Sequence, residues 1–338
     1  SKSATEGSSQ LSSLHDAARR LARLDAGEVL QEEPLARHCS WRIGGPADIL
    51  VQPSSCDQAA RVLRFAREEG LPLVVIGRGT NLLFADEGFR GVIMKLGRRF
   101  SDFEIDGLTV RARAGLWVPR LVRNLAAAGL SGLEHAAGIP GSVGGLVTMN
   151  GGSLRRCVGD RVVDVLAVGY SGEMRIFSRE ECGFSYRRSV FQDSAGVRGD
   201  RWVILEARLV LERGRRSEVR AEAVGIMEER RKKFPLRLPN CGSVFTNDPA
   251  VYELAGPPGK VVEDTGLKGL TIGGAQVSHH HANFIVNRDG ATARDVLSLI
   301  GEVRRRVHAR IGAWLACEVR YVAPDGAVAP ASEACGEL

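Results

Sequence analysis

Apolar positions along the chain follow two periods, and each period predicts a kind of element. Near the N-terminus, Leu11, Leu14, Ala18 and Leu21 recur at helical spacing and predict a short amphipathic helix after a polar stretch. Short apolar blocks predict strands at 47–51, 72–76, 91–95, 108–114, 162–169, 174–177, 203–211, 271–276, 282–287 and 316–322. Longer amphipathic blocks predict helices at 57–69, 119–128, 217–232 and 292–310. This mixture predicts an α/β (α+β) protein.

The length of the chain predicts more than one domain. With 338 residues it exceeds a single compact core, so we expect two or three domains. The charged helix at 217–232 ends before Pro235, as a helix does near a proline, and we take it as the entry to the last domain. That domain is expected to contain a glycine- and proline-rich loop at 256–259, and the tail from Ala323 is expected to be unstructured.

Composition narrows the class of protein. Hydrophobic residues make up 44% of the chain and charged residues 25%, as in ordinary soluble proteins. No run approaches the about 18 consecutive apolar residues of a membrane span, and the first residues lack the apolar core of a signal peptide. The seven cysteines are odd in number and scattered, which predicts reduced thiols and neither a disulfide framework nor a zinc site. The sequence therefore predicts a cytoplasmic protein with no membrane partner.

The net charge of +6 raises the question of an anionic partner. Basic and acidic residues are interleaved, and no nucleic-acid-binding motif is visible, so nucleic acid is not an expected partner. An anionic small molecule, such as a dinucleotide or a sugar nucleotide, suits the surplus of basic residues better.

Three glycine-rich segments carry candidate chemistry for such a ligand: glycine segment 1 (residues 40–47), glycine segment 2 (residues 74–83) and glycine segment 3 (residues 137–145). Glycine lets the backbone approach a ligand closely, so that consecutive N–H groups can hold a phosphate. Segment 2 follows a predicted strand but fails the dinucleotide fingerprint, because Leu82 stands at the third glycine position. No Gly-Lys-Ser/Thr follows it, so it is not a P-loop either.

These segments resemble the FAD-binding segments of flavoproteins of the vanillyl-alcohol-oxidase type. Over residues 40–321 their order is most similar to the UDP-N-acetylenolpyruvoylglucosamine reductase (UDP-N-acetylmuramate dehydrogenase) family, in its branch with a short insertion. The resemblance implies a two-part FAD-binding region and a smaller C-terminal α+β substrate domain. The implied parts are an N-terminal tail and short helix (1–25), FAD-binding subdomains 1 (26–98) and 2 (99–215), a substrate-binding domain (216–325) and a tail (326–338). The residues implied to bind FAD are Ser40, Gly44, Gly45, Ile76, Gly77, Arg78, Gly79, Thr80, Asn81, Leu82, Ala137, Gly138, Pro140, Gly141, Ser142, Gly144 and Gly145.

Three further motifs match the family in the same order: the arginine motif (residues 184–189), the serine motif (residues 240–245) and the glutamate motif (residues 316–321). The resemblance implies that NADPH reduces the flavin, which then reduces the enolpyruvyl group of a UDP-sugar. An enol ether accepts a hydride only if its carboxylate takes up negative charge, so catalysis needs a cation or acid there and a proton donor for the adjacent carbon. Arg187 suits the carboxylate because guanidinium binds carboxylates in a bidentate way, and Glu318 suits the same site if it is partly protonated. Ser243 as the proton donor rests on the resemblance alone.

The resemblance also implies substrate contacts by Tyr186, Lys233 and Asn247, with Lys232 as an alternative to Lys233. A lysine and an amide both suit a uridine diphosphate. The run His279–His280–His281 is predicted to lie on a strand, where alternate side chains face opposite ways, and no metal site is expected there. The resemblance implies a monomer acting in peptidoglycan precursor synthesis.

The sequence leaves alternatives open at residues 151–156, where the family usually has a stretch of alanine and glycine that ends in an aromatic residue and glycine. A paralogous flavin reductase of a related nucleotide sugar or enol ether would keep Arg187, Ser243 and Glu318 but differ here. Another FAD-dependent oxidase of the same fold would not need this catalytic set. A nucleic-acid-binding module would bind DNA in a salt-sensitive way and would not be yellow.

Overall fold

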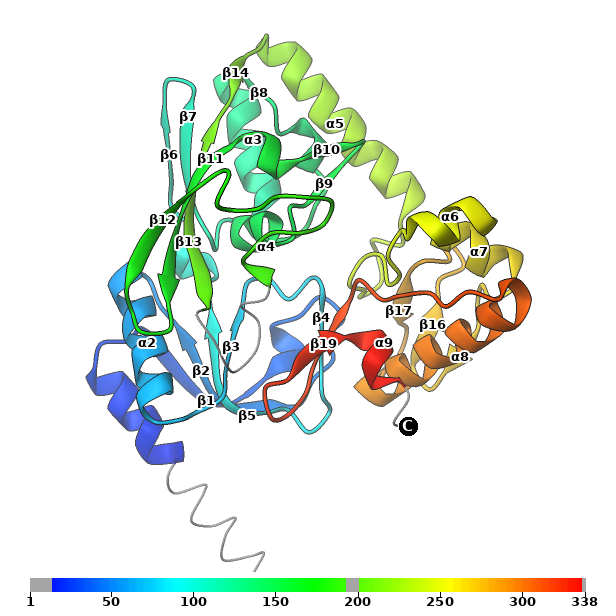
Figure 1. Ribbon diagram of the computed structural model, residues 1–338, viewed down its shortest axis with the longest axis horizontal. Coiled ribbons are helices and arrows are strands. Elements are labelled where there is room, and N and C mark those ends of the chain that lie inside the picture. Colours follow the sequence, from blue (N-terminus) through cyan, green and yellow to red (C-terminus); the bar gives the residue numbers. More distant parts are fainter. Residues whose placement is uncertain (1–13, 193–200, 336–338) are drawn as a thin grey trace, which may run out of the picture. The chain divides into compact units, whose positions relative to one another are not determined.

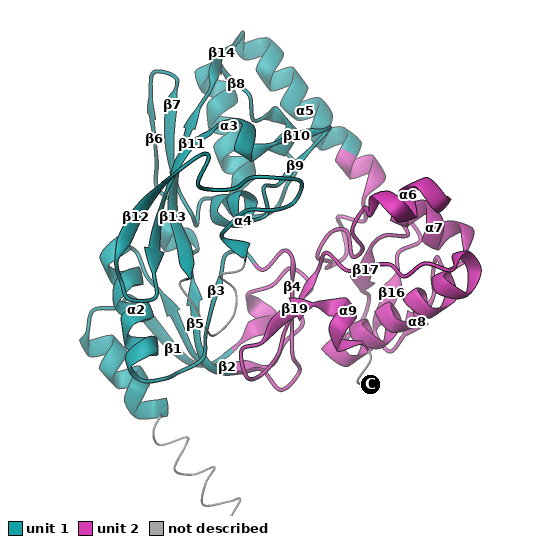
Figure 2. Cartoon of the chain, viewed as in Figure 1, with its two compact units in different colours: residues 1–33, 47–78, 90–229 teal, residues 34–46, 79–89, 230–338 magenta. Residues whose placement is uncertain are grey.

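The computed structural model describes residues 14–192 and 201–335 (Figure 1). The chain divides into two compact units, and each unit combines separated stretches of sequence (Figure 2). Unit 1 comprises residues 1–33, 47–78 and 90–229, and unit 2 comprises residues 34–46, 79–89 and 230–338. The contiguous division into parts at 26–98, 99–215 and 216–325 stays a prediction.

Unit 1 is built on two sheets. A four-stranded sheet has the order β1-β2-β5-β3, with β3 and β5 parallel, and a five-stranded antiparallel sheet has the order β12-β11-β13-β7-β6. Its strands are β1 (Glu28–Pro34), β2 (Pro46–Gln52), β3 (Leu73–Ile76), β5 (Phe89–Lys95), β6 (Phe103–Asp106), β7 (Thr109–Arg113), β8 (Leu130–Ser131), β9 (Gly152–Ser153), β10 (Arg156–Cys157), β11 (Val162–Gly169), β12 (Met174–Ser178), β13 (Trp202–Val210) and β14 (Glu212–Arg213). Its helices are α2 (Cys56–Glu68), α3 (Val118–Ala128), α4 (Val143–Thr148) and α5 (Arg216–Lys233), which ends in unit 2, after a helix over residues 14–23.

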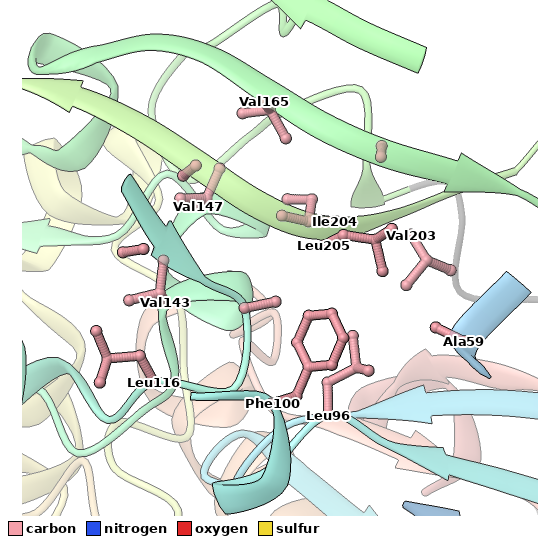
Figure 3. Close-up of a cluster of buried hydrophobic side chains, with 14 of the residues drawn as sticks. Ala59, Leu96, Phe100, Leu116, Val143, Val147, Val165, Val203, Ile204 and Leu205 are labelled. Carbon is pink, nitrogen blue, oxygen red and sulfur yellow. The ribbon is translucent and has the colours of Figure 1, made fainter. Parts of the chain in front are cut away.

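The core of unit 1 explains why the short helix α4 is held in place. Figure 3 shows Phe100, Leu116, Val143, Val147 and Leu205 in one cluster of buried side chains, each 1% exposed or less. Val143 and Val147 are four residues apart, so both lie on the same face of α4 and pack into this cluster. Burial of a valine side chain stabilises by roughly 1.5–3 kcal/mol. The core therefore fixes the helix that glycine segment 3 opens.

Unit 2 joins a piece of the N-terminal half of the chain to its C-terminal end. One three-stranded sheet has the order β19-β18-β4, in which β4 and β18 are parallel, and a second has the antiparallel order β15-β16-β17. The long helix α8 begins at a capping box of Thr292 and Asp295 and packs against β15 and β16. The elements are β4 (Leu82–Phe84), α6 (Pro249–Ala255), α7 (Pro258–Asp264), β15 (Thr271–Ile272), β16 (Ala275–Val277), β17 (Ile285–Asn287), α8 (Ala293–Ile311), β18 (Arg320–Val322), β19 (Val328–Pro330) and α9 (Ala331–Ala334).

The structure confirms most of the predicted elements and corrects several. The amphipathic N-terminal helix is confirmed over residues 14–23, while Leu11 and the polar stretch before it lie outside the described residues. The loop predicted at 256–259 is confirmed only at residues 256 and 257, because α7 begins at Pro258. The unstructured tail predicted from Ala323 is also wrong, because β19 pairs with β18 and α9 follows it. The strands predicted at 271–276, 282–287 and 316–322 are shorter than expected or are divided by a turn.

Buried His135, in the 3-10 turn η3 (Glu134–Ala136), predicts a pH dependence of stability. The residue is 1% exposed, and among the described residues neither ring nitrogen has a hydrogen-bond partner. Burial, followed by the nearby Arg156 guanidinium, lowers the pKa of His135 to about 4. The unfolded chain therefore binds a proton near pH 6.5 that the folded chain does not bind until about pH 4. The free energy of unfolding should fall by about 3 kcal/mol from this residue as the pH drops through that window.

Urea unfolding at pH 7.5 and pH 4.5 measures this effect. His135→Leu should show a smaller loss of stability between the two pH values than the parent chain. An equal loss in both proteins would contradict the assignment.

Candidate functional site

Glycine segments 2 and 3 meet in unit 1 at Gly77 and Ser142. Gly77 follows β3, and a Cβ atom built on it would overlap the Ser142 Oγ. Ser142 is 3% exposed and is the N-cap of α4, where its Oγ accepts a hydrogen bond from the Gly145 N–H at 3.4 Å. The absence of a side chain at Gly77 is therefore what lets the two segments come together.

A substitution at Gly77 tests this contact. Gly77→Ala should lower the free energy of unfolding by about 1–3 kcal/mol, because the new methyl group has no room beside Ser142. It should also weaken FAD binding, because both segments must shift. Urea unfolding and FAD titration of the apoprotein measure the two effects.

Gly225→Ala is the matched control for Gly77→Ala. It lies in α5, where an added Cβ meets nothing within 4 Å. This substitution should raise stability by about 0.5–1 kcal/mol. Equal effects of the two substitutions would show that Gly77 has no steric role.

Glycine segments 1 and 2 meet in unit 2. The Ser40 N–H donates to the Gly79 carbonyl at 3.0 Å. Gly79 has a φ of +62°, and a Cβ on it would overlap the His38 carbonyl. Gly45 donates its N–H to the Ala85 carbonyl at 3.0 Å, and a Cβ there would overlap the Asp86 carbonyl. Glycine is thus required at both positions by close backbone approach.

The serine motif is held against these two segments within unit 2. The Ser40 hydroxyl donates to the Asn240 carbonyl at 2.6 Å. The Cys241 thiol, 3% exposed, donates to the Leu82 carbonyl at 3.3 Å. Burial raises the pKa of Cys241 to about 12, so this thiol stays protonated and acts as a donor. These contacts join residues about 160 to 200 positions apart in the sequence, and they place Cys241, two residues before Ser243, against the end of segment 2.

Ser243 and Glu318 lie on neighbouring segments of unit 2. The Glu318 N–H donates to the Val244 carbonyl at 2.8 Å, and Phe245 and Cys317 form an antiparallel bridge. The Asn81 side-chain amide donates to the Glu318 carbonyl at 3.2 Å. Both Ser243 and Glu318 are partly exposed. Unit 2 therefore brings together one residue implied to bind FAD and two of the three implied to be catalytic.

Asn283 is a residue whose role the sequence analysis did not find. Its side chain is 6% exposed and forms two hydrogen bonds with Phe245, accepting from the N–H at 2.9 Å and donating to the carbonyl at 3.0 Å. Its own carbonyl accepts from the Val244 N–H at 2.9 Å. Asn283 thus pairs with the serine motif as a neighbouring strand would. An isolated asparagine in a sequence gives no signal for such a role.

Removal of the Asn283 side chain should therefore disturb the serine motif. Asn283→Ala leaves two buried backbone groups of Phe245 unpaired, which should cost about 3 kcal/mol in the free energy of unfolding. Chemical denaturation measures the change, and Asn124→Ala is the control, since the partly exposed Asn124 side chain donates to the Arg120 carbonyl within α3. A loss as small as that of the control would contradict this role.

Arg187 belongs to unit 1, in a tight turn closed by hydrogen bonds between Ser185 and Arg188 at 3.1 Å. Its φ is +55°, a left-handed conformation that is costly for a residue with a side chain and that is often found at functional sites. The Gln192 side chain donates to the Arg187 carbonyl at 2.6 Å, and the Arg187 guanidinium donates to the Gly152 carbonyl at 3.4 Å. The guanidinium therefore lies against the stretch at 151–156 that departs from the family pattern.

This stretch forms the hairpin of β9 and β10. Its two turn residues, Leu154 and Arg155, both have positive φ, at 55° and 60°, as in the mirror-image turns that suit hairpins. Asn150 precedes the hairpin, with its amide donating to the Ser185 carbonyl at 2.8 Å. The departure in sequence is thus accommodated by a regular local structure.

The three residues implied to bind substrate are exposed. Tyr186, at 70% exposed, belongs to unit 1 beside Arg187. Lys233 ends α5, with its Nζ 5.6 Å from the Phe234 ring centroid, and Asn247 immediately precedes the N-cap of α6; both belong to unit 2.

The predicted strand at His279–His280–His281 is wrong, because these residues form a bend between β16 and β17. Instead of alternating across a sheet, His281 packs against the rings of Phe234 and Phe284, with centroids 5.3 and 5.1 Å away. Among the described residues, no three histidine, cysteine, aspartate or glutamate side chains form a cluster that could hold a metal ion.

The donors of segment 2 suit the phosphate groups of a dinucleotide. Within the described residues, the amide hydrogens of Gly79, Thr80 and Asn81 donate to no backbone acceptor, and Gly79 gives this turn its left-handed conformation, with a φ of +62°. Consecutive unpaired amides bind phosphate oxygens without a side-chain charge. The residues present therefore fit FAD.

Two family models match the chain, and relatives match most of its length. The FAD binding domain matches residues 47–178, and the C-terminal domain of UDP-N-acetylenolpyruvoylglucosamine reductase matches residues 234–322. UDP-N-acetylenolpyruvoylglucosamine reductase 1 of Corynebacterium glutamicum is 46% identical over 88% of this chain and 87% of its own length. The enzyme of that name from Heliobacterium modesticaldum is 43% identical over 89% of this chain and 92% of its own.

The chain belongs to the UDP-N-acetylenolpyruvoylglucosamine reductase family. A solved reductase of this family from Thermus caldophilus matches with a TM-score of 0.72 and 30% identity, over 87% of this chain and 98% of that one. These matches confirm the FAD-binding fold and an FAD-dependent oxidoreductase. None of the described helices has the length and apolarity needed to cross a membrane.

Proposed function

We propose that the chain catalyses the NADPH-dependent reduction of the enolpyruvyl group of UDP-N-acetylglucosamine enolpyruvate, which gives UDP-N-acetylmuramate for peptidoglycan precursor synthesis. The observation that carries this proposal is the pairing of Glu318 in unit 2 with Val244, the neighbour of Ser243, and with Asn81, since it joins the serine and glutamate motifs to a segment that suits FAD. Bound FAD would accept a hydride from NADPH and supply it to the enolpyruvyl double bond. The residues that would hold FAD lie in glycine segments 1, 2 and 3.

Arg187 would hold the substrate carboxylate. Its guanidinium offers two parallel N–H donors to a carboxylate, and a preorganised cation favours the transition state in which negative charge builds up there. Glu318, when protonated, would donate a further hydrogen bond to the same group. Both residues act on charge that is larger in the transition state than in the substrate, so their removal should lower kcat more than it raises KM.

Ser243 would give its proton to the carbon next to the carboxylate. A serine hydroxyl is a weak acid, but the carbanion-like species that it meets is strongly basic, so the transfer is downhill. Tyr186, Lys233 and Asn247 would bind the UDP-sugar, with lysine at a phosphate oxygen and the asparagine amide at a polar edge. The exposure of these three side chains supports a role in binding a soluble ligand.

We further propose that the protein acts as a monomer in the cytoplasm, without a nucleic-acid or membrane partner. Seven cysteines that form no disulfide support a reducing compartment. Sedimentation of the purified protein measures its oligomeric state.

A related enol ether or nucleotide sugar is the second candidate substrate, because the hairpin at 151–156 lies against Arg187 and departs from the family pattern. The product distinguishes the candidates. Incubation without oxygen with NADPH and UDP-N-acetylglucosamine enolpyruvate should yield a species two hydrogen masses heavier than the substrate. An unchanged substrate together with a reducible flavin would favour the second candidate.

A further inference from the structure

Trp117 touches two of the glycine segments within unit 1. It immediately precedes α3 and is 40% exposed. Its indole Nε1–H donates to the Pro140 carbonyl of segment 3 at 3.1 Å. The guanidinium carbon of Arg78, in segment 2, lies 5.3 Å from its ring centroid. A single side chain thus contacts both segments of unit 1 that are proposed to hold FAD.

The backbone around Trp117 fixes the position of its ring. Trp117 forms an antiparallel bridge with Ser142. The Val118 N–H donates to the Gly141 carbonyl at 3.1 Å, and the Leu116 carbonyl accepts from the Val143 N–H at 2.8 Å. Hydrogen bonds on both sides of the tryptophan therefore tie its backbone to segment 3. The indole can serve as a fixed platform for the flexible arginine above it.

Arg78 lies near a second positive charge, that of Arg98, and this arrangement favours an anionic ligand. Partial burial of Arg78 lowers the pKa of its guanidinium, and the positive charge of the nearby Arg98 lowers it further. In the described part of the chain, no carboxylate forms an ion pair with Arg78 or with Arg98. Two guanidinium groups that repel one another gain most from an anionic ligand that lies between or beside them. A tryptophan face provides the best aromatic surface for an arginine and leaves its N–H groups available at the edge.

We propose that Trp117 is a positioning residue for FAD, whose ring holds the Arg78 guanidinium beside segment 3 so that it binds the diphosphate of the dinucleotide. The inference rests on the proposed function, in which Arg78 and segment 3 contact FAD. Trp117 itself acts through Arg78 and through the Pro140 carbonyl.

Titration of the apoprotein with FAD, followed by the quenching of flavin fluorescence, tests the role of Trp117. Trp117→Ala should raise the Kd for FAD about tenfold, because both the platform and the hydrogen bond are lost. Trp117→Phe keeps a ring under Arg78 but loses the indole N–H, so it should restore part of the affinity and leave the Kd about threefold raised. The chain offers a matched control in Trp314→Ala, since Trp314 is 50% exposed, belongs to unit 2 and stacks on His308.

A double-substitution cycle shows whether Trp117 acts through Arg78. Arg78→Ala should weaken FAD binding in the parent chain and should have a much smaller effect when Trp117 is already alanine. A structural role alone would instead lower the thermal stability of the apoprotein and leave the two effects additive. Additive effects, or a Kd for Trp117→Ala within twofold of the Trp314→Ala control, would overturn the inference.

The same titrations separate this inference from the proposed function. If the parent chain binds FAD and Arg78→Ala weakens it while Trp117→Ala does not, the positioning role is wrong and the proposed function stands. If the parent chain does not bind FAD, both are wrong.

Discussion

Replacement of Ser243 by alanine should slow turnover of the enolpyruvyl substrate about a thousandfold, which lies within the range of a lost general acid. Reduction of the flavin by NADPH should remain near the parent rate, because that half-reaction needs no proton from the substrate side. The backbone contacts of the serine motif, from Val244 to Asn283 and Glu318, involve no Ser243 hydroxyl and should survive the substitution. Anaerobic stopped-flow measurement of the two half-reactions separates them.

The control for this experiment is Thr246→Val, three residues further along the same segment. The Thr246 hydroxyl donates to the Ala316 carbonyl at 3.2 Å, so its loss disturbs the same pair of segments without touching the proposed acid. It should change turnover by less than about threefold. If Ser243→Ala slowed both half-reactions together, Ser243 would be a structural residue and not the proton donor.

Replacement of Arg187 by methionine should lower kcat for the enolpyruvyl half-reaction by about a hundredfold to a thousandfold, as is typical when a charge-stabilising donor is removed. The guanidinium is proposed to bind the carboxylate on which negative charge builds up, so kcat should fall more than KM rises. Arg187→Lys keeps the charge but not the paired donors and should recover only part of the rate. Steady-state kinetics over a range of substrate concentrations gives both constants.

Arg188→Met is the control for Arg187→Met, because it removes a positive charge from the same turn. Arg188 is the exposed neighbour of Arg187 in the same motif, and its loss removes one positive charge from the same surface. It should leave kcat within about twofold of the parent. Equal losses from Arg188→Met and Arg187→Met would mean that general surface charge, and not a carboxylate contact, accounts for the effect.

The sequence predicted the long helices and strands well, because the spacing of hydrophobic residues along each element decides which of its side chains are buried. Six of the 13 residues of α2 are buried, and the hydrophobic positions that predicted this helix are the ones that pack. Short helices were missed where proline, which is common in loops, instead stands in the first turn of a helix. The prolines at 257 and 258 were taken as a sign of a loop, yet Pro258 occupies the first turn of α7, as Pro249 does in α6, where a missing N–H costs nothing. The strand β19 was missed because its pairing with β18 closes a hairpin that three residues of sequence do not signal.

The candidate site was only partly accessible from the sequence. The glycine segments and the three motifs were found as separate stretches, but their contacts join residues such as Ser40 and Asn240, which local pattern cannot connect. Asn283 illustrates the limit most clearly, since it pairs with the serine motif through its side chain 38 residues away. The roles of Arg187, Ser243 and Glu318 remain predictions, and the experiments above address the first two.

The central claim is tested most directly by NADPH consumption without oxygen, followed at the nicotinamide absorbance, with and without UDP-N-acetylglucosamine enolpyruvate. The proposed function predicts catalytic consumption that depends on this substrate and stops when it is exhausted. Consumption limited to one equivalent of NADPH per flavin, whether or not the substrate is present, would contradict it.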